Sequence, residues 1–338
     1  MQTSRKLTHA LVALFALVLM SAAAFGQIIG QPYPADSPIS DQKAGSVLIY
    51  NFYTSASTPT PSHNTQIAIT NTSTTNGVVA HLYFVGQDCT VIDFQVPLSK
   101  NQTTRFTTQE FDPGFSGYLV VVAEDFATGT PISFNRLIGD EYVKLPNGAS
   151  ASLAAEAISA VYGPDGTLLD DAFIDATNAA AVLRFGQTYN ALPTQLAVSS
   201  VPSRADGNET TVILNRIEGS LIDGMLSVPR LAVLVYDDRE TPFSSQFLAG
   251  QCQKRLILSD TEPRLVTRFS TAIPKGRSGW IRINTSPTTQ NIALLGAVIN
   301  YNPSTATVSD AFNGGHNLHK LSFTNNVISI TVPVFPIP

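Results

Sequence analysis

The chain contains little cysteine, tryptophan, histidine or charge. Its 338 residues include two cysteines, one tryptophan and five histidines, and only 13% of them are charged. Two cysteines exclude a disulfide-dense scaffold, in which several bridges compensate for a small core. The formal net charge of −5, without a run of Lys or Arg, argues against a nucleic-acid partner, which requires a basic footprint. Few side chains are left for acid–base or metal chemistry.

Long apolar stretches are also missing, except near the N-terminus. Arg5 and Lys6 precede an uncharged apolar stretch from Leu11 to Ala24. A basic region, an apolar region and small residues in this order are typical of a secretory signal. We expect a signal peptide over residues 1–26, a secreted, periplasmic or cell-surface location, and no membrane span after cleavage. Residues 27–44 have three prolines and no periodicity, which predicts a flexible Pro-rich leader.

Short runs rich in Val, Ile, Tyr, Phe and Thr fill most of the remaining chain, with turn residues between them. Seven such runs precede residue 140, as an immunoglobulin-like sandwich requires, and a similar set begins near residue 182. We expect an all-β protein with two tandem immunoglobulin-like β-sandwich domains, over residues 45–148 and 182–338. Between them, over residues 149–181, a helical spacing of apolar residues that begins at Leu153 predicts a short linking helix.

Fixed spacings between unlike residues indicate that one sandwich duplicates the other. Cys89 is followed after fifteen residues by the triplet 104–106 (Thr-Arg-Phe), and Cys252 after fifteen by the same triplet at 267–269. A turn follows each triplet, and an apolar run then begins around Gly117 or Gly279. A repeated spacing of this kind is typical of a duplicated unit. It predicts that the triplets overlay and that both glycines begin equivalent strands.

The two cysteines either pair between the sandwiches or are both free and buried. Export favours oxidation. Equivalent positions of tandem domains rarely meet, however, and the repeat places Cys89 and Cys252 at equivalent positions. We therefore favour unbridged cysteines, although sequence alone leaves the pairing open.

The end of the chain alternates between apolar and other residues from Asn326 to Pro338 and includes three prolines. Proline cannot donate a hydrogen bond to a neighbouring strand, so it is confined to edges and strand ends. We expect an ordered edge strand that buries Ile330 and Val332.

Three blocks, Val47 to Ser55, Pro131 to Lys144 and Gly314 to Leu321, resemble a group of uncharacterised secreted two-domain β-proteins from environmental bacteria. The resemblance covers most of the chain after the signal peptide. It implies an exported bacterial protein with two domains. The group carries no established activity, so the resemblance implies no substrate or catalytic residue.

Metal-binding candidates are weak. His316 and His319 form the one His-x-x-His pair, which could chelate a metal on a helix but not on a strand. Further ligands are not close in sequence, so a structural role is favoured. Two acidic clusters could bind calcium, but neither has the residue order of an EF-hand loop. For both clusters we favour acidic residues in solvated turns. We expect no cofactor. The clusters are Asp165, Asp170, Asp171 and Asp175, and Asp237, Asp238 and Glu240.

Aromatic residues give the best indication of binding. Tyr50, Phe52 and Tyr53 lie in the first predicted strand, and Trp280 lies in the second half. Such rings could stack on sugars, although strand aromatics more often belong to a core. No nucleophile elbow or phosphate-binding loop is present. We expect a non-enzymatic surface or matrix component, or an adhesive or binding module, with a glycan or another surface protein as its partner. A carbohydrate-binding protein is the alternative, and a hydrolase with a spatially assembled site is third.

Overall fold

The computed structural model describes residues 39–161, 172–175, 179–265, 267–285, 292–304 and 313–335. Within these residues the structure is almost entirely β, and no helix is long and apolar enough to cross a membrane. The predicted signal peptide, most of the predicted leader, and Asp165, Asp170 and Asp171 lie outside the described residues. The predicted all-β fold is confirmed.

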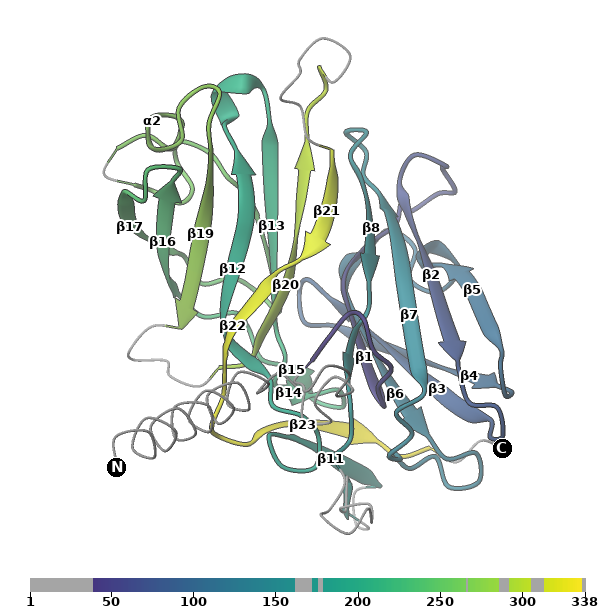
Figure 1. Ribbon diagram of the computed structural model, residues 1–338. Helices are drawn as coiled ribbons and strands as arrows, with labels where there is room; N and C mark the ends of the chain where they lie inside the picture. The colour runs from purple at the N-terminus through teal and green to yellow at the C-terminus, as the bar shows by residue number, and fades with distance from the viewer. Residues whose placement is uncertain are drawn as a thin grey trace, which may run out of the picture. The chain divides into compact units, whose positions relative to one another are not determined.

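The first sandwich packs a five-stranded sheet against a four-stranded sheet (Figure 1). In the five-stranded sheet the strands lie side by side in the order β4 (Val91–Leu98), β3 (Val78–Gly86), β6 (Ser116–Glu124), β1 (Val47–Thr54) and β9 (Glu156–Ile158). In the four-stranded sheet the order is β5 (Thr103–Thr107), β2 (Asn64–Asn71), β7 (Leu137–Lys144) and β8 (Ser150–Ala154). Apolar side chains from both sheets, including Ile69 and Phe84, fill the space between them. The pairings β2–β5 and β3–β6, in opposite sheets, are those at the centre of an immunoglobulin-like sandwich.

The second sandwich repeats this arrangement. The strand order of its five-stranded sheet is β17 (Pro242–Phe247), β16 (Leu231–Asp237), β19 (Ser278–Thr285), β12 (Pro193–Pro202) and β22 (His319–Phe323). The strand order of its four-stranded sheet is β18 (Gln253–Ile257), β13 (Glu209–Arg216), β20 (Leu294–Tyr301) and β21 (Gly314–Asn317). Each strand therefore has a counterpart at the same place in the first sandwich. Two tandem sandwiches of one topology are present, as the strand pattern predicted.

Local details of the two copies also correspond. The pairing of β1 with β6 is interrupted between Tyr50 and Tyr53, and the pairing of β12 with β19 is interrupted at the counterpart place. Gly117 and Gly279 are each the second residue of their strand. A Cβ atom at either position would clash with a carbonyl oxygen of the neighbouring strand, so glycine permits the close approach. The predicted equivalence of these two glycines is confirmed.

The Thr-Arg-Phe triplets, in contrast, are not equivalent. Residues 104–106 lie in β5, whereas residues 267–269 lead into the short helix α2 (Phe269–Ala272). In the first copy the fifteen-residue interval spans β4, and in the second it spans β18, the counterpart of β5. The predicted overlay of the triplets is therefore wrong.

The same mismatch explains a disulfide bond that the repeat argued against. Cys89 and Cys252 are bridged, with their Cα atoms 5.1 Å apart. Cys89 lies in the turn between β3 and β4, whereas Cys252 directly precedes β18. The cysteines occupy different places in the two copies, so the symmetry argument against their meeting does not apply. The preference for unbridged cysteines is wrong.

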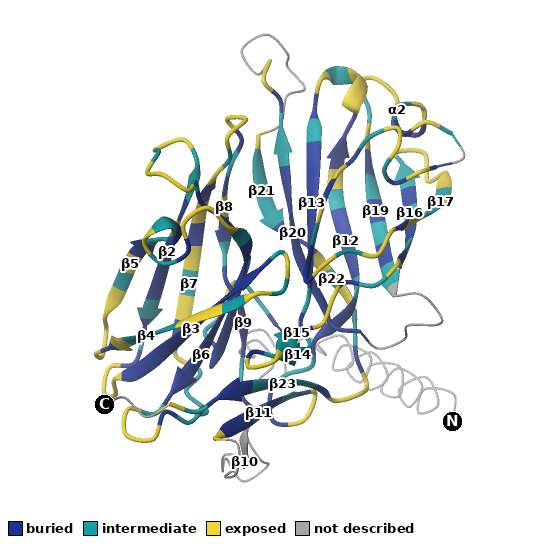
Figure 2. Cartoon of the chain, turned by 180° about the vertical axis from the view of Figure 1, so that it is seen from behind, coloured by how far each residue is buried: buried dark blue, intermediate teal, exposed yellow. Residues whose placement is uncertain are grey.

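A third sheet covers the outer face of β1, β3 and β6. It runs β10 (Ala172–Asp175), β11 (Ala180–Phe185), β23 (Ile328–Pro333), β14 (Gly219–Ser220), β15 (Gly224–Met225). Side chains of this sheet, including Ile330 and Val332, share one buried cluster with Val47, Ile49 and Val120. The first sandwich therefore has strands buried on both faces, which Figure 2 shows in dark blue and which explains their unbroken apolar sequences.

Two predicted elements differ from the structure. The linking helix is absent, because residues 150–158 form β8 and β9. Ala151 and Leu153 are buried while their neighbours are more exposed, so the segment alternates as a strand, and pairing with β7 overrides the helical preference of alanine. The C-terminal strand exists and buries Ile330 and Val332 as predicted, but it lies between β11 and β14 and is not an edge strand.

The two sandwiches share an interface that is partly polar. Phe52 of β1 contributes to an apolar cluster that also contains Ile213 and Ala297 of the second sandwich. Beside it, the Nδ2 of Asn51 donates a hydrogen bond to Asn317 Oδ1 at 2.9 Å, and the Nδ2 of Asn215 donates to the Asn51 carbonyl at 2.9 Å. Buried amides that bond to one another in this way fix a single relative placement of the packed strands.

Candidate functional site

Among the described residues, no third sheet covers the face of the second sandwich whose counterpart in the first is covered. Strands β12, β16 and β19 correspond to β1, β3 and β6, whose outer face lies under the third sheet. On the second sandwich this face carries half-exposed side chains that belong to none of the buried clusters of the described residues. We call it the open face: Ala232, Leu234 and Tyr236 of β16, and Trp280, Arg282 and Asn284 of β19. The duplicated fold has therefore produced one apolar, buried face and one aromatic and polar face.

An aromatic pair lies at one end of the open face. Tyr236 and Trp280 are direct partners in neighbouring strands. Their rings stack with centroids 4.4 Å apart and planes 7° apart. One face of each ring is taken by the other ring, and the pair remains half-exposed, so ring edges and outer faces are open to a ligand.

Polar groups continue from the aromatic pair along β19. Trp280, Arg282 and Asn284 point to the open side, while Ile281 and Ile283 point into the core. The Nε of Arg282 and the Oδ1 of Asn284 are buried atoms without a hydrogen-bond partner among the described residues. The two side chains as a whole are half-exposed, so polar groups two and four residues from an aromatic ring are within reach of a ligand rich in hydroxyl groups.

The face is hollowed beyond Asn284. Ala232, Ser244 and Gln246 line a depression of about 320 Å³, and Arg230 and Arg264 lie at its rim. Ala232 pairs with Asn284 on one side and with Gln246 on the other, so the depression continues the open face. The aromatic pair and the depression therefore lie on the same face of one sheet, with Ala232 belonging to both the open face and the depression.

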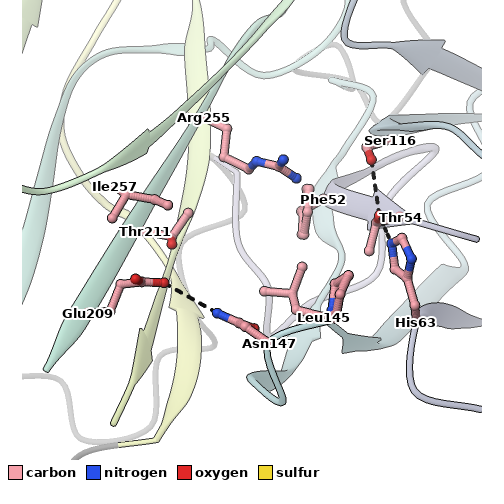
Figure 3. A pocket seen from close by; sticks show the side chains of 11 residues that line it. Phe52, Thr54, His63, Ser116, Leu145, Asn147, Glu209, Thr211, Arg255 and Ile257 are labelled. Carbon is pink, nitrogen blue, oxygen red and sulfur yellow. Dashed lines mark hydrogen bonds between the residues drawn. The ribbon is translucent and has the colours of Figure 1, made fainter. Parts of the chain in front are cut away.

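The four aromatic residues predicted to bind a ligand lie in different environments. Tyr50 and Tyr53 are buried in the first sandwich, where their hydroxyls donate to the Ala68 carbonyl and to Asp112 Oδ2. Neither ring has surface for a ligand. Phe52 is also buried, but it lines a groove between the sandwiches beside Arg255 (Figure 3). Trp280 alone of the four lies on the open face.

The predicted metal pair does not have a metal-site arrangement. His316 lies in β21 and His319 in β22, with ring centroids 5.7 Å apart. The ring of His316 bonds to the Asn317 carbonyl, and His319 Nε2 lies 3.0 Å from Ser199 Oγ. The described residues contain no group of three or more His, Cys, Asp or Glu side chains that could hold a metal ion. Since His319 is opposite Ala197, it lies at the edge of the open face.

In the acidic turn between β16 and β17, backbone amides of the turn itself donate hydrogen bonds to Asp237. Asp237 Oδ1 accepts from the amides of Arg239 and Thr241 at 2.9 and 2.8 Å, and these hydrogen bonds lower the pKa of Asp237. Asp238 pairs with Arg277 at 2.6 Å. Glu240 is exposed. The geometry is that of an acid-capped turn.

Sequence patterns did not reveal a buried ionic network in the first sandwich. His81 Nδ1 lies 2.9 Å from Glu124 Oε1, and its Nε2 lies 2.9 Å from Asp93 Oδ2. Burial alone lowers the pKa of His81, but hydrogen bonds and charge from the two carboxylates outweigh it and raise the pKa. Tyr83 stacks on the imidazole at 4.1 Å. The three groups come from β3, β4 and β6. His81 and Glu124 are buried, whereas the Asp93 side chain is 44% exposed, so the network joins a buried pair to one surface acid, which is consistent with a structural role.

Sequence reasoning found Trp280 but missed Tyr236, Arg282 and Asn284. A signal was present for the last two, since Arg and Asn alternate with two isoleucines directly after the tryptophan. Tyr236 had none, because its partnership with Trp280 depends on strand pairing across 44 residues, from 236 to 280.

Comparisons with known proteins give no family. No protein-family model and no curated protein matches the chain. A partial N-terminal region of an enterococcal surface protein is similar at 9% identity and a TM-score of 0.19, over 87% of this chain and 98% of that one. A truncated AlyQ with CBM32 and alginate lyase domains is similar at 8% identity and a TM-score of 0.19, over 87% and 83%. An FMN-binding beta-glucuronidase from Facaelibacterium prausnitzii L2-6 is similar at 11% identity and a TM-score of 0.14, over 91% and 36%. TM-scores this low carry no argument about function.

Proposed function

We propose that this protein is an exported, non-enzymatic carbohydrate-binding protein that recognises a glycan on the open face of its second sandwich. One observation carries the proposal. The duplicated fold buries the outer face of β1, β3 and β6, but on the equivalent face of the second sandwich it leaves an aromatic pair beside the half-exposed polar side chains of Arg282 and Asn284. A sugar ring can place its C–H face against an aromatic side chain and its hydroxyls against Arg282 and Asn284.

Export is part of the proposal. The N-terminal segment has the order of a secretory signal, and disulfide bonds such as Cys89–Cys252 persist in oxidising compartments. The proposal also includes surface or matrix attachment, with a glycan or a glycosylated surface protein as partner. Recovery of the natural protein with two free thiols would contradict export.

Glycan binding can be measured through the single tryptophan. Because Trp280 is the one tryptophan of the chain, its fluorescence reports contact with the open face directly. We expect at least one member of a panel of cello-, xylo- and manno-oligosaccharides to shift or quench this emission. Calorimetry should show that Tyr236→Ala and Trp280→Ala each weaken binding roughly tenfold or more, as central aromatic contacts do.

The matched control is Tyr142→Ala, which removes an exposed tyrosine from the first sandwich and should leave affinity unchanged. Binding that survives both Tyr236→Ala and Trp280→Ala would place the glycan elsewhere. A panel without any ligand would remove the support for a glycan function.

A further inference from the structure

A groove between the two sandwiches has a composition unlike that of the open face (Figure 3). Its volume is about 320 Å³, at the small end of the range for ligand pockets. The first sandwich lines it with Phe52, Thr54, His63, Ser116 and the β7–β8 turn, and the second lines it with Glu209, Thr211, Arg255 and Ile257. Both sandwiches must be in place for the groove to exist.

Arg255 is the cation of this groove. Its guanidinium carbon lies 5.7 Å from the centroid of the Phe52 ring, so the charged group is held against an aromatic side chain. Arg255 has no ion pair with any acidic side chain among the described residues. Partial burial and the positive charge of Arg255 both lower the pKa of His63, which disfavours a second positive charge in the groove. Arg255 is exposed, so the groove offers one accessible positive charge that has no ion-pair partner among the described residues.

Hydroxyl and amide groups surround this charge. Thr54 Oγ1 lies 2.8 Å from His63 Nε2 and 3.0 Å from Ser116 Oγ, which forms a row of polar groups on the side of the first sandwich. On the other side, the Nδ2 of Asn147 donates to Glu209 Oε1 at 3.3 Å, so the acid of the groove is engaged away from Arg255 (Figure 3). Groups that can both donate and accept suit a ligand with several hydroxyls.

We propose that this groove binds a sugar acid, with the carboxylate of a uronic acid residue on Arg255 and its hydroxyls on the surrounding polar side chains. Guanidinium and carboxylate form paired, charge-assisted hydrogen bonds, and the contact with the Phe52 ring favours a placement of the Arg255 side chain over the groove. A peptide carboxylate would satisfy Arg255 as well, but it carries fewer hydroxyls that could add hydrogen bonds to these polar groups. The proposal does not depend on glycan binding at the open face.

The test is calorimetry on the full, oxidised protein with glucuronate and galacturonate, in parallel with glucose and with an N-acetylated dipeptide. We expect the two uronates to bind and glucose to bind at least about tenfold more weakly, as loss of a charge-assisted contact implies. Arg255→Ala should weaken uronate binding roughly tenfold or more. Arg255→Lys should retain part of the affinity, since it keeps the charge and loses the planar geometry.

The matched control is Arg105→Ala, which removes an exposed arginine of β5 far from the groove and should not change uronate binding. Equal binding of glucose and glucuronate, or uronate binding that is unchanged in Arg255→Ala, would overturn the proposal. A dipeptide that binds more tightly than either uronate would identify a peptide site instead. If none of the probes binds, the groove is not a binding site for sugar acids and the proposal is wrong. Tyr236→Ala should leave uronate affinity unchanged, which separates this result from the outcome at the open face.

Discussion

At the scale of single residues, Glu141 is the clearest conflict between charge and surroundings. Its side chain is 1% exposed, and neither carboxylate oxygen has a hydrogen-bond partner among the described residues. Burial raises the pKa of Glu141 well above its usual range, and the nearby Phe52 amide, not placed for a full hydrogen bond, offsets only part of this effect. Because the folded-state pKa lies above the unfolded one, stability is fully present below the unfolded pKa and is lost as pH rises through the folded pKa.

We therefore expect Glu141→Gln to stabilise the protein at neutral pH and to have little effect near pH 4. The gain should be roughly 1–3 kcal/mol, because the carboxyl of the unfolded chain is ionised at pH 7 and must take up a proton or bury its charge on folding, whereas glutamine does neither. Urea denaturation at pH 4 and pH 7 measures both. Asp140→Asn, at the exposed neighbouring position, is the control and should change little at either pH. Destabilisation by Glu141→Gln at pH 7 would mean that the carboxylate has a favourable partner.

At the scale of elements, β23 determines whether the first sandwich is covered. It lies between β11 and β14, and its Ile330 is fully buried against the outer face of the sheet that contains β1, β3 and β6. The strand comes from the far end of the chain. Its position closes a core that joins residues from both ends of the described chain, from Ile39 to Val332.

Ile330→Ala should lower the free energy of unfolding by roughly 2–5 kcal/mol, as large-to-small changes in a core do. Ser329→Ala, at the neighbouring residue that points away from this core, should cost much less. Thermal melts and binding of a hydrophobic dye would report the loss. Equal effects of the two substitutions would show that β23 is only loosely attached to the third sheet.

At the scale of the whole molecule, one disulfide bond cross-links the two sandwiches. Cys89 and Cys252 are 163 residues apart in sequence, so their bridge closes a very long loop. In the chain-entropy model such a bridge disfavours the unfolded state by roughly 5 kcal/mol. The groove around Arg255 depends on the same relative placement of the sandwiches.

We expect Cys89→Ser combined with Cys252→Ser to lower the stability by roughly 3–5 kcal/mol. Chemical reduction of the natural chain should have the same effect, with denaturation midpoints as the measurement. A reduced protein with an unchanged midpoint would show that the buried amides and apolar contacts between the sandwiches are sufficient. Thr90→Ser, beside Cys89 in the same turn, is a control for local disturbance.

The sequence by itself determined the all-β class, the tandem arrangement, the equivalence of Gly117 and Gly279, and the ordered C-terminal strand. These follow from local properties: alternation of apolar residues, turn chemistry, and the need for glycine where two backbones approach closely. Trp280 was identified for a similar reason, since a lone tryptophan in a strand is a candidate at any exposed face. Such signals are carried by a few consecutive residues.

Only the tertiary structure decided which faces are covered and which residues meet. Tyr50 and Trp280 are both strand aromatics, yet Tyr50 lies in a core and Trp280 lies on the open face. The difference arises because β1 is covered on one side by the third sheet and on the other by the four-stranded sheet of its sandwich. Described residues cover only one side of β19. The disulfide, the pairing of Tyr236 with Trp280 and the approach of Arg255 to Phe52 all join residues distant in sequence. Contacts of this kind depend on how complete sheets pack, and the local alternation that forms each strand does not specify the neighbour that the strand will find.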